Sequence, residues 1–437
     1  MTPSYPISRR TVTWAASGTL ALGVLAGGAP AVASGGAADS ARGHPWVNAW
    51  QGSPTAGGTF SHASCPADTG LKDQTARNIV FTSAGGHEVR VRVSNAFGSM
   101  PLQVGAASIG VQKQGAATLP GTLRTVRFSG RNSTLIPAGG EALSDPVHLE
   151  VRALQRLAVS VYLPGATGPA TQHNNSRETN YLAAGNQAGS AQGAAFGTKI
   201  GCWMFASGVD VRPDRDVRGT VVALGDSITD GDQSTIDADQ RYPDHLARRL
   251  AALHGPTLSV SNAGIGGNEL LFNRTPALFG VSALARLPRD VLTQAGAREV
   301  ILLEGINDIG AEAATATSLI QADQLIIAQA HAAGLRIYGA TLVPFGGSNT
   351  RYGGNYGTSA GERQRQALNH WIRTSGAFDA VFDFDRALRD PKDPTRLLPA
   401  YDSGDHLHPS DAGYRAMAAA VDLRVLLRDL HADSAAA

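Results

Sequence analysis

One segment, Val221-Val-Ala-Leu-Gly-Asp-Ser-Ile-Thr-Asp-Gly231, constrains the fold of this chain more than any other. Its four apolar residues, 221–224, predict a short buried strand that ends at Gly225. A polar turn follows and carries Ser227. A strand that delivers a polar side chain beyond its carboxyl end fits an open parallel sheet, in which ligands bind outside the strand ends.

The turn by itself allows two interpretations. It can lift the hydroxyl of Ser227 out of the core beside backbone N–H groups, which is what an acyl-transfer nucleophile needs. It can also be an ordinary strand-to-helix turn in which Asp226 or Ser227 caps the next helix. The rest of the chain decides between them.

The first residues, 1–33, are typical of an export signal. Arg9-Arg10 precede a mostly apolar run at 15–26, and Ala31-Val-Ala33 offers a cleavage site. Twin arginines favour the bacterial Tat route, with an ordinary Sec signal as the alternative. We therefore expect a secreted protein with no membrane-spanning segment in the mature chain, because no later apolar run approaches about 20 residues.

Residues 44–212 show a pattern of period two, which predicts an antiparallel β-sandwich accessory domain. The run His87-Glu-Val-Arg-Val-Arg-Val93 alternates valine with arginine, and Gly-, Pro- and Asn-rich turns separate it from similar runs. We expect Trp46 and Trp50 to anchor its core; a sugar-stacking surface is the alternative. Cys65 and Cys202 are the two cysteines of the chain. In an exported protein they predict a disulfide that joins the start of this domain to its end, although two unpaired thiols stay possible.

From 218 to 437 strands alternate with helices. Strands are expected at 221–224, 257–261, 299–303, 335–343 and 380–384, and helices at 242–254, 283–295, 317–333, 362–374 and 411–430. This alternation predicts a doubly wound parallel sheet between two layers of helices. A net charge of +1 argues against a nucleic-acid partner.

Four loops that follow predicted strands carry complementary polar groups. His408 can take the proton of Ser227, since an imidazole with a pKa of about 6.5 is mostly neutral at pH 7. Asp405, three residues earlier, can orient that ring. The N–H groups of Ser227 and Gly267 and the side-chain amide of Asn307 can bind the oxyanion of a tetrahedral intermediate. We expect a glycine at 267 because a side chain there would crowd the substrate.

Two other kinds of site fit parts of this pattern less well. An α/β-hydrolase elbow needs glycine two residues after the serine, where this chain has Thr229. A metal site would use Asp405, His406 and His408, with Asp226 and Asn307 completing a dinuclear centre. That arrangement leaves the serine without a role, so we expect neither a metal nor a cofactor. His406 is expected at the surface, and Asn262 and Asp308 are expected to support their loops.

The four loops resemble the four sequence blocks of SGNH (GDSL-type) esterases. The matching segments are Gly225-Asp-Ser-Ile228, Gly264-Ile-Gly-Gly-Asn268, Gly305-Ile-Asn-Asp308 and Asp405-His-Leu-His408. The resemblance implies a flavodoxin-like three-layer α/β/α domain. It also implies Ser227 as nucleophile, His408 as base, Asp405 as its orienting group, and Ser227, Gly267 and Asn307 as oxyanion donors.

Several substrates are compatible with this sequence. Lipid or short-chain esters are the leading class, and acetyl or feruloyl esters of polysaccharides come next if the β-domain binds glycans. A secreted binding protein with an inactive hydrolase domain is an alternative of another kind. Apolar and aromatic residues near the predicted strand ends line a substrate pocket or belong to ordinary packing: Leu270, Leu271, Phe272, Phe279, Phe345, Tyr352, Tyr356 and Tyr401. The loop 346–361 is a candidate lid.

Overall fold

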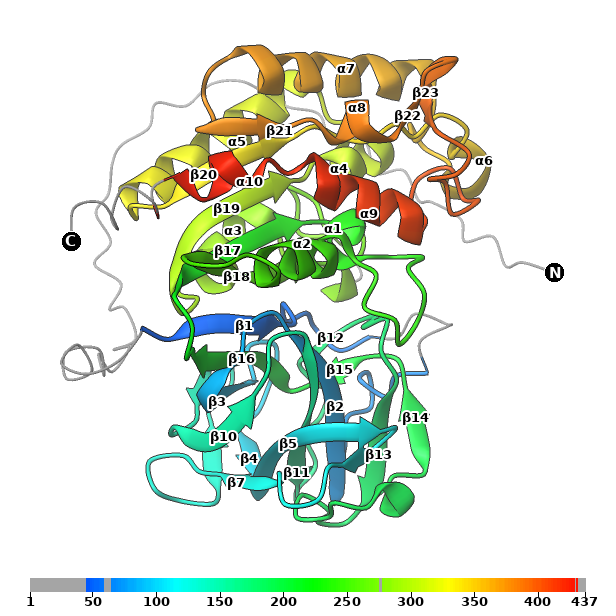
Figure 1. The fold of residues 1–437 in the computed structure, drawn as a ribbon. Helices are drawn as coiled ribbons and strands as arrows, with labels where there is room; N and C mark the ends of the chain where they lie inside the picture. The colour runs from blue at the N-terminus through cyan, green and yellow to red at the C-terminus, as the bar shows by residue number, and fades with distance from the viewer. Residues whose placement is uncertain (1–44, 59–63, 275–276, 429, 431–437) are drawn as a thin grey trace, which may run out of the picture. The chain divides into compact units, whose positions relative to one another are not determined.

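The computed structural model describes residues 45–58, 64–274, 277–428 and 430 (Figure 1). Contacts group residues 43–437 into one compact unit. The predicted leader at 1–33 lies outside the described residues. Within the described ranges, no helix is both long and apolar enough to cross a membrane.

The first half of the described chain is an antiparallel β-rich domain, as expected. One sheet has the order β1-β16-β3-β10, and a larger one has the order β14-β13-β2-β11-β5-β6. Its strands are β1 (Val47–Gln51), β2 (Gln74–Thr82), β3 (Gly86–Ser94), β4 (Leu102–Val104), β5 (Ala106–Gln114), β6 (Ala117–Thr118), β7 (Arg124–Val126), β8 (Thr134–Ile136), β9 (Glu141–Leu143), β10 (Val147–Val151), β11 (Gln155–Leu163), β12 (Gln172–His173), β13 (Asn180–Ala184), β14 (Thr198–Ile200), β15 (Trp203–Met204) and β16 (Ala206–Arg212).

The alternating pattern of β3 buries one face of that strand. Val89, Val91 and Val93 are fully buried, and they belong to one apolar cluster drawn from both sheets. Trp50 is part of the same cluster. Trp46 is also buried, with the guanidinium groups of Arg90 and Arg212 over its ring. Both tryptophans therefore pack inside the domain and offer no exposed surface for stacking a sugar.

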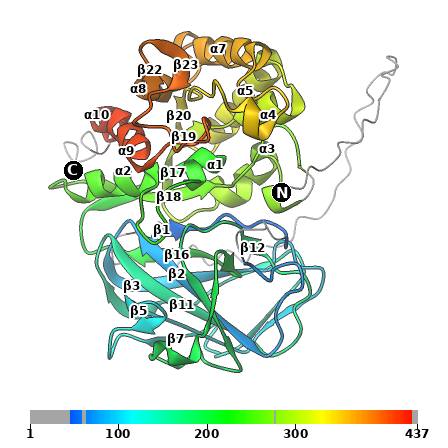
Figure 2. The same cartoon turned by 90° about the vertical axis from the view of Figure 1, so that its right-hand side faces the viewer.

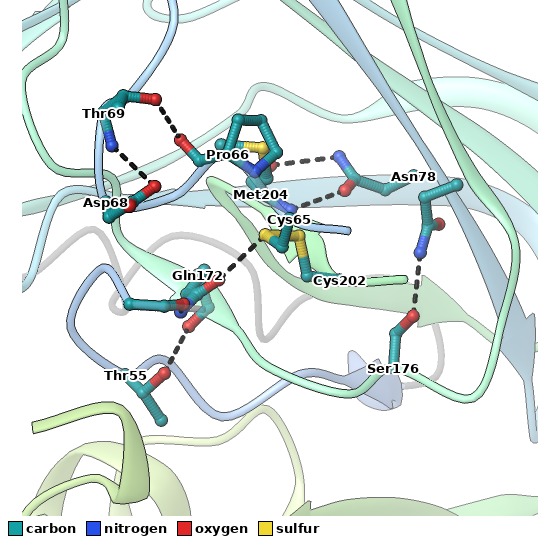
Figure 3. Close-up of a disulfide and its surroundings, with 12 residues drawn as sticks. Thr55, Cys65, Pro66, Asp68, Thr69, Asn78, Gln172, Ser176, Cys202 and Met204 are labelled. Carbon is teal, nitrogen blue, oxygen red and sulfur yellow. Dashed lines mark hydrogen bonds between the residues drawn. A yellow bond between two sulfur atoms is a disulfide. The ribbon is translucent and has the colours of Figure 1, made fainter. Parts of the chain in front are cut away.

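Cys65 and Cys202 form a disulfide across 137 residues of sequence (Figure 3). Cys202 immediately precedes β15, and β15 pairs with β12. The sulfur of Cys65 also lies 3.0 Å from Oε1 of Gln172 in β12. The bond therefore ties the beginning of the described chain to the short β12–β15 ribbon.

The second half is built on a parallel sheet of order β18-β17-β19-β20-β21. Its strands are β17 (Val217–Gly225), β18 (Thr257–Gly264), β19 (Ala297–Leu303), β20 (Arg336–Ala340) and β21 (Ala380–Phe382), and a hairpin joins β22 (Arg389–Asp390) to β23 (Asp393–Leu397). The chain runs from β17 to β18 on one side and then crosses to β19 on the other. The end of β17 is therefore the switch point where open α/β sheets bind ligands.

Helices cover both faces of this sheet, which gives the predicted α/β/α arrangement (Figure 2). α2 packs against α9, and α9 against α8; on the opposite face α5 contacts α3 and α7. The helices are α1 (Ser227–Asp230), α2 (Tyr242–Ala251), α3 (Ala283–Leu287), α4 (Ile306–Glu312), α5 (Ala316–Ala332), α6 (Asn349–Tyr352), α7 (Ser359–Thr374), α8 (Phe384–Leu388), α9 (Asp411–Ala420) and α10 (Leu423–Leu426), with 3-10 turns at Gly193–Ala195 and Ala277–Phe279.

Two expected helices are interrupted. The helix predicted at 283–295 is α-helical only to Leu287 and continues as a π-helix over Pro288–Leu292, since Pro288 lacks the N–H that an α-helix needs. The final helix predicted at 411–430 divides into α9 and α10, because Asp422 caps a new helix through the N–H of Arg424.

Whether the regions before and after 212–218 are separate domains stays a prediction.

Candidate active site

The turn after β17 both caps the next helix and carries the serine beyond the strand end, so it fits both interpretations of the sequence. Asp226 is the N-cap of α1 and accepts a hydrogen bond from the N–H of Ile228 at 2.8 Å. Ser227 is the first residue of that helix and lies at the switch point of the sheet. Gly225 is needed because a Cβ there would come within 2.0 Å of Thr229 Oγ1. Capping of the helix and placement of the serine beyond the strand end thus occur together.

Ser227, His408 and Asp405 lie in hydrogen-bond contact. His408 Nε2 is 2.8 Å from Ser227 Oγ, and His408 Nδ1 is 2.7 Å from Asp405 Oδ2. The other oxygen of Asp405 accepts the N–H groups of Leu407 and His408. The carboxylate is therefore fixed by its own loop, just before α9, and holds the imidazole with its Nε2 toward the serine.

The two charged groups of this trio have opposite pKa shifts. Burial alone lowers the pKa of His408, but the nearby carboxylates of Asp232 and Asp405 outweigh it, so the pKa is raised above its usual value. Burial opposes ionisation of Asp405, yet the hydrogen bonds from His408 and Leu407 hold the pKa of its carboxyl well below its usual range. Asp405 is thus ionised, and the imidazole binds a proton readily.

Besides Ser227, the two residues expected to bind an oxyanion, Gly267 and Asn307, lie on two segments that contact each other. Asn307 lies in α4, just after β19, and its Nδ2 donates to the carbonyl of Asn268 at 2.7 Å. Gly267 has a φ of +73°, which favours glycine. A Cβ at 267 would lie 2.4 Å from the Phe279 ring, which is a second reason for a glycine besides the crowding of substrate expected from the sequence.

Two tyrosines of the candidate lid take part in the site. Tyr352 donates to Asp405 Oδ2 at 2.9 Å and lies 3.4 Å from His408 Nδ1. Tyr356 donates to Asn307 Oδ1 at 2.7 Å. The sequence placed both tyrosines near the strand ends but did not separate a pocket lining from ordinary packing. The structure gives each a polar partner at the site.

Two further charged residues at the site were missed in the sequence. Asp232 Oδ2 lies 3.7 Å from His408 Nε2. The sequence feature that could have identified Asp232 is its position directly after the Asp226–Gly231 turn. Arg286 is fully buried and donates to the carbonyls of Gly225 and Ala263, the ends of β17 and β18. The sequence feature that could have identified Arg286 is that it is the single cationic residue in the otherwise apolar α3.

Arg286 binds three more side chains besides those carbonyls, namely Asn268 Oδ1, Asp290 and Glu304. A buried guanidinium that satisfies two strand ends and the Asn268 loop holds these loops in fixed positions. Removal of Arg286 would leave several buried acceptors unpaired, so it is primarily a structural requirement of the site.

The remaining candidates have supporting or packing roles. Asn262 donates to the Thr229 carbonyl at 2.9 Å, and Asp308 accepts the N–H groups of Leu270 and Leu271. His406 pairs with Asp402 at 2.6 Å and is partly exposed. Among the apolar candidates Leu270 and Phe345 are fully buried in the core, whereas Phe272 is exposed. Over the ranges that the structure describes, no group of three His, Cys, Asp or Glu side chains is arranged to hold a metal ion.

This geometry agrees with a family match. Residues 223–416, somewhat less than half of the chain, match the model of the GDSL-like lipase/acylhydrolase family. Residues 223–416 form a GDSL-like acylhydrolase domain. Lipases and acylhydrolases cleave acyl esters, so hydrolysis of an ester is the general activity that the match assigns. A search of curated proteins found no significant match.

The GDSL-like domain is also similar to solved structures. An aryl esterase of M. smegmatis is 17% identical, with 48% of this chain and 99% of that chain covered and a TM-score of 0.39. A carbohydrate acetylesterase family member from Sinorhizobium meliloti is 18% identical, with 48% and 99% covered and a TM-score of 0.38. A GDSL-like lipase from Bacteroides thetaiotaomicron is 19% identical, with 48% and 88% covered and a TM-score of 0.36.

Proposed function

We propose that this protein is an exported serine carboxylester hydrolase that works through an acyl-enzyme on Ser227. The observation that carries the proposal is the pair of contacts on His408, 2.8 Å to Ser227 Oγ and 2.7 Å to Asp405 Oδ2. A base within hydrogen-bond reach of a hydroxyl, itself oriented by a carboxylate, is the arrangement that activates a serine.

In the first half-reaction, Ser227 Oγ attacks the ester carbonyl carbon while its proton passes to His408 Nε2. The N–H groups of Ser227 and Gly267 and the second hydrogen of Asn307 Nδ2 stabilise the oxyanion. Collapse of the tetrahedral intermediate breaks the bond to the alcohol oxygen, which takes the proton from His408. Loss of one such oxyanion donor typically lowers kcat by about 10²- to 10³-fold.

In the second half-reaction, His408 takes a proton from water as the water attacks the acyl carbon. Collapse then returns that proton to Ser227 Oγ and releases the carboxylic acid. Asp405 stays ionised throughout and stabilises the imidazolium that forms twice in each cycle. No step requires a cofactor.

Lipid or short-chain esters stay the leading substrate class of this proposal. Ser227 is 5% exposed and His408 is 3% exposed, so both reacting groups are buried. The buried Trp46 and Trp50 give no support to glycan stacking, so acylated polysaccharides stay the second substrate class. Export rests on the residues of the predicted leader, and the disulfide is compatible with it.

Hydrolysis of p-nitrophenyl acetate by the purified protein and by Ser227→Ala tests this proposal. We expect the wild type to release p-nitrophenol and the variant to lose turnover while its thermal unfolding is unchanged. A folded wild-type protein that cleaves neither this ester nor longer p-nitrophenyl esters would instead support the inactive binding protein. EDTA should leave the rate unchanged; a loss restored by added metal would favour the metal site.

A further inference from the structure

A histidine of the β-rich domain contacts the turn that carries the nucleophile. His173, at the end of β12, is 3% exposed. Its Nε2 lies 2.9 Å from Asp230 Oδ1, and its Nδ1 lies 2.9 Å from the carbonyl of Ser53. Both partners offer oxygen atoms, so the ring bridges the Ser53 carbonyl and the Asp230 carboxylate inside the protein.

Asp230 connects that histidine to the loop that we assign to oxyanion binding. It is the last residue of α1, three residues after Ser227. Its second oxygen, Oδ2, accepts the N–H of Gly266 at 3.1 Å. Gly266 immediately precedes Gly267, so the direction of the Gly267 N–H depends on where this carboxylate holds the loop. One side chain thus joins His173, the nucleophile helix and the oxyanion loop.

The position of His173 is itself fixed within the β-rich domain. β12 pairs with β15, with His173 opposite Trp203. Gln172, the preceding residue, donates its side-chain amide to the carbonyls of Ala56 and Gly58 and lies beside the Cys65–Cys202 disulfide (Figure 3). These contacts make β12 a rigid support, which is what precise placement of a second group requires.

We propose that His173 is a positioning residue for ester hydrolysis, acting through Asp230 to hold the Gly266–Gly267 turn in its oxyanion-binding geometry. This inference rests on the proposed esterase function and adds to it a role for the β-rich domain. Without His173, one oxygen of the buried Asp230 carboxylate loses its hydrogen-bond donor. Rotation of the Asp230 side chain toward another donor then becomes favourable. Gly266 then loses its acceptor. A displacement of about 1 Å in a catalytic group can lower a rate by about 100-fold.

Neighbouring contacts confine the effect to the Asp230–Gly266 connection. Arg241 donates to the Asp230 carbonyl at 2.9 Å and to the Ser176 carbonyl, and Asn175 donates to Asp232 at 3.1 Å. These bonds connect residues 175–176 with residues 230–232 whatever residue stands at 173. A substitution there should therefore change the side chain of Asp230 rather than the fold.

The test compares His173→Leu, His173→Gln and Asp230→Ala with the wild type in steady-state hydrolysis of p-nitrophenyl acetate. His173→Leu should lower kcat by about 10- to 100-fold with KM changed less than threefold. Gln keeps an N–H donor near the position of Nε2, so His173→Gln should recover part of that loss. The control is His148→Gln, whose side chain in β10 is 86% exposed. It should behave as the wild type.

Amide hydrogen exchange of residues 264–268 provides a measurement that does not depend on activity. Exchange there should be faster in His173→Leu and unchanged in His148→Gln. Folded His173→Leu with wild-type kcat, or with unchanged exchange at 264–268, would overturn the inference while the wild-type activity still supported the esterase. A wild-type protein inactive on all esters would overturn the proposed function and the catalytic role of His173 together.

Discussion

The carboxylate of Asp232 lies 3.7 Å from Nε2 of His408, the ring nitrogen that contacts Ser227. His408 therefore has a carboxylate near each nitrogen, Asp405 at Nδ1 and Asp232 at Nε2. Both raise the pKa of the imidazole against the opposite effect of its burial. A general base must be neutral to act, so with His408 as the proposed base we expect this arrangement to set the pH at which hydrolysis begins.

The first prediction concerns that pH. Because the pKa of His408 is raised, the acidic limb of kcat/KM should have its midpoint above about 6.5, the usual histidine value. Asp232→Asn removes a charge that raises this pKa, so the limb should move down by about half to one pH unit. Stopped assays from pH 5 to 9 measure it. Asp422→Asn removes an exposed carboxylate that pairs with Arg424 and should leave the limb in place. A limb that does not move in Asp232→Asn contradicts the prediction.

The second prediction concerns the hydrogen bond between Tyr356 and Asn307. Tyr356→Phe removes the donor to Asn307 Oδ1, so the amide is free to rotate away from the oxyanion. We expect kcat to fall by about tenfold, less than the 10²- to 10³-fold loss expected for Asn307→Ala. Tyr338→Phe is the matched control, because it removes a 2.8 Å bond to Glu299 inside the sheet. It should lower stability by about 1 kcal/mol without changing kcat. Equal kcat losses in the two phenylalanine variants would refute a specific role for Tyr356.

The third prediction separates backbone strain from steric clash at Gly267. Gly267→Ala meets both a φ of +73° and the Phe279 ring at 2.4 Å from the new Cβ. Gly139→Ala has a similar φ of +77° but nothing within 4 Å of its Cβ. Both should lose about 1 kcal/mol of stability from the left-handed backbone. Only Gly267→Ala should also lose kcat, by about 10-fold or more. Full activity in that variant would count against an oxyanion role for this loop.

The fourth prediction concerns the disulfide. The chain has two cysteines, so a reductant has one target. Cross-linking across 137 residues restricts the unfolded chain, and its loss should lower the free energy of unfolding by about 2–4 kcal/mol. Thermal unfolding of the native protein, the reduced protein and the Cys65→Ser, Cys202→Ser double variant measures this. Equal melting temperatures in all three would show that the bond adds no stability.

Local sequence was enough to predict the elements of the α/β domain. The apolar run before Gly225 predicts β17, because a short apolar run that ends at a glycine and a polar turn is typical of a buried strand. The spacing of Asp405 and His408 predicts that they meet, because three residues bring two side chains together on one turn. A periodic pattern does not show the helix boundaries near Pro288 and Asp422, since one depends on the missing N–H of a proline and the other on a capping side chain.

Long-range contacts could be obtained only from the tertiary structure. Nothing near Ser227 in the sequence indicates that His173, 54 positions before it, holds Asp230, or that Asp232 faces His408. Tyr356 and Arg286 likewise gain their roles from partners on other loops. The physical reason is that a hydrogen bond depends on distance and direction in space, whereas a pattern along the chain records only which side chains face the same way. The sequence was enough to predict the sheet and to name the candidate reacting groups at its edge, and the packing of the chain decided which neighbours set their charge and orientation.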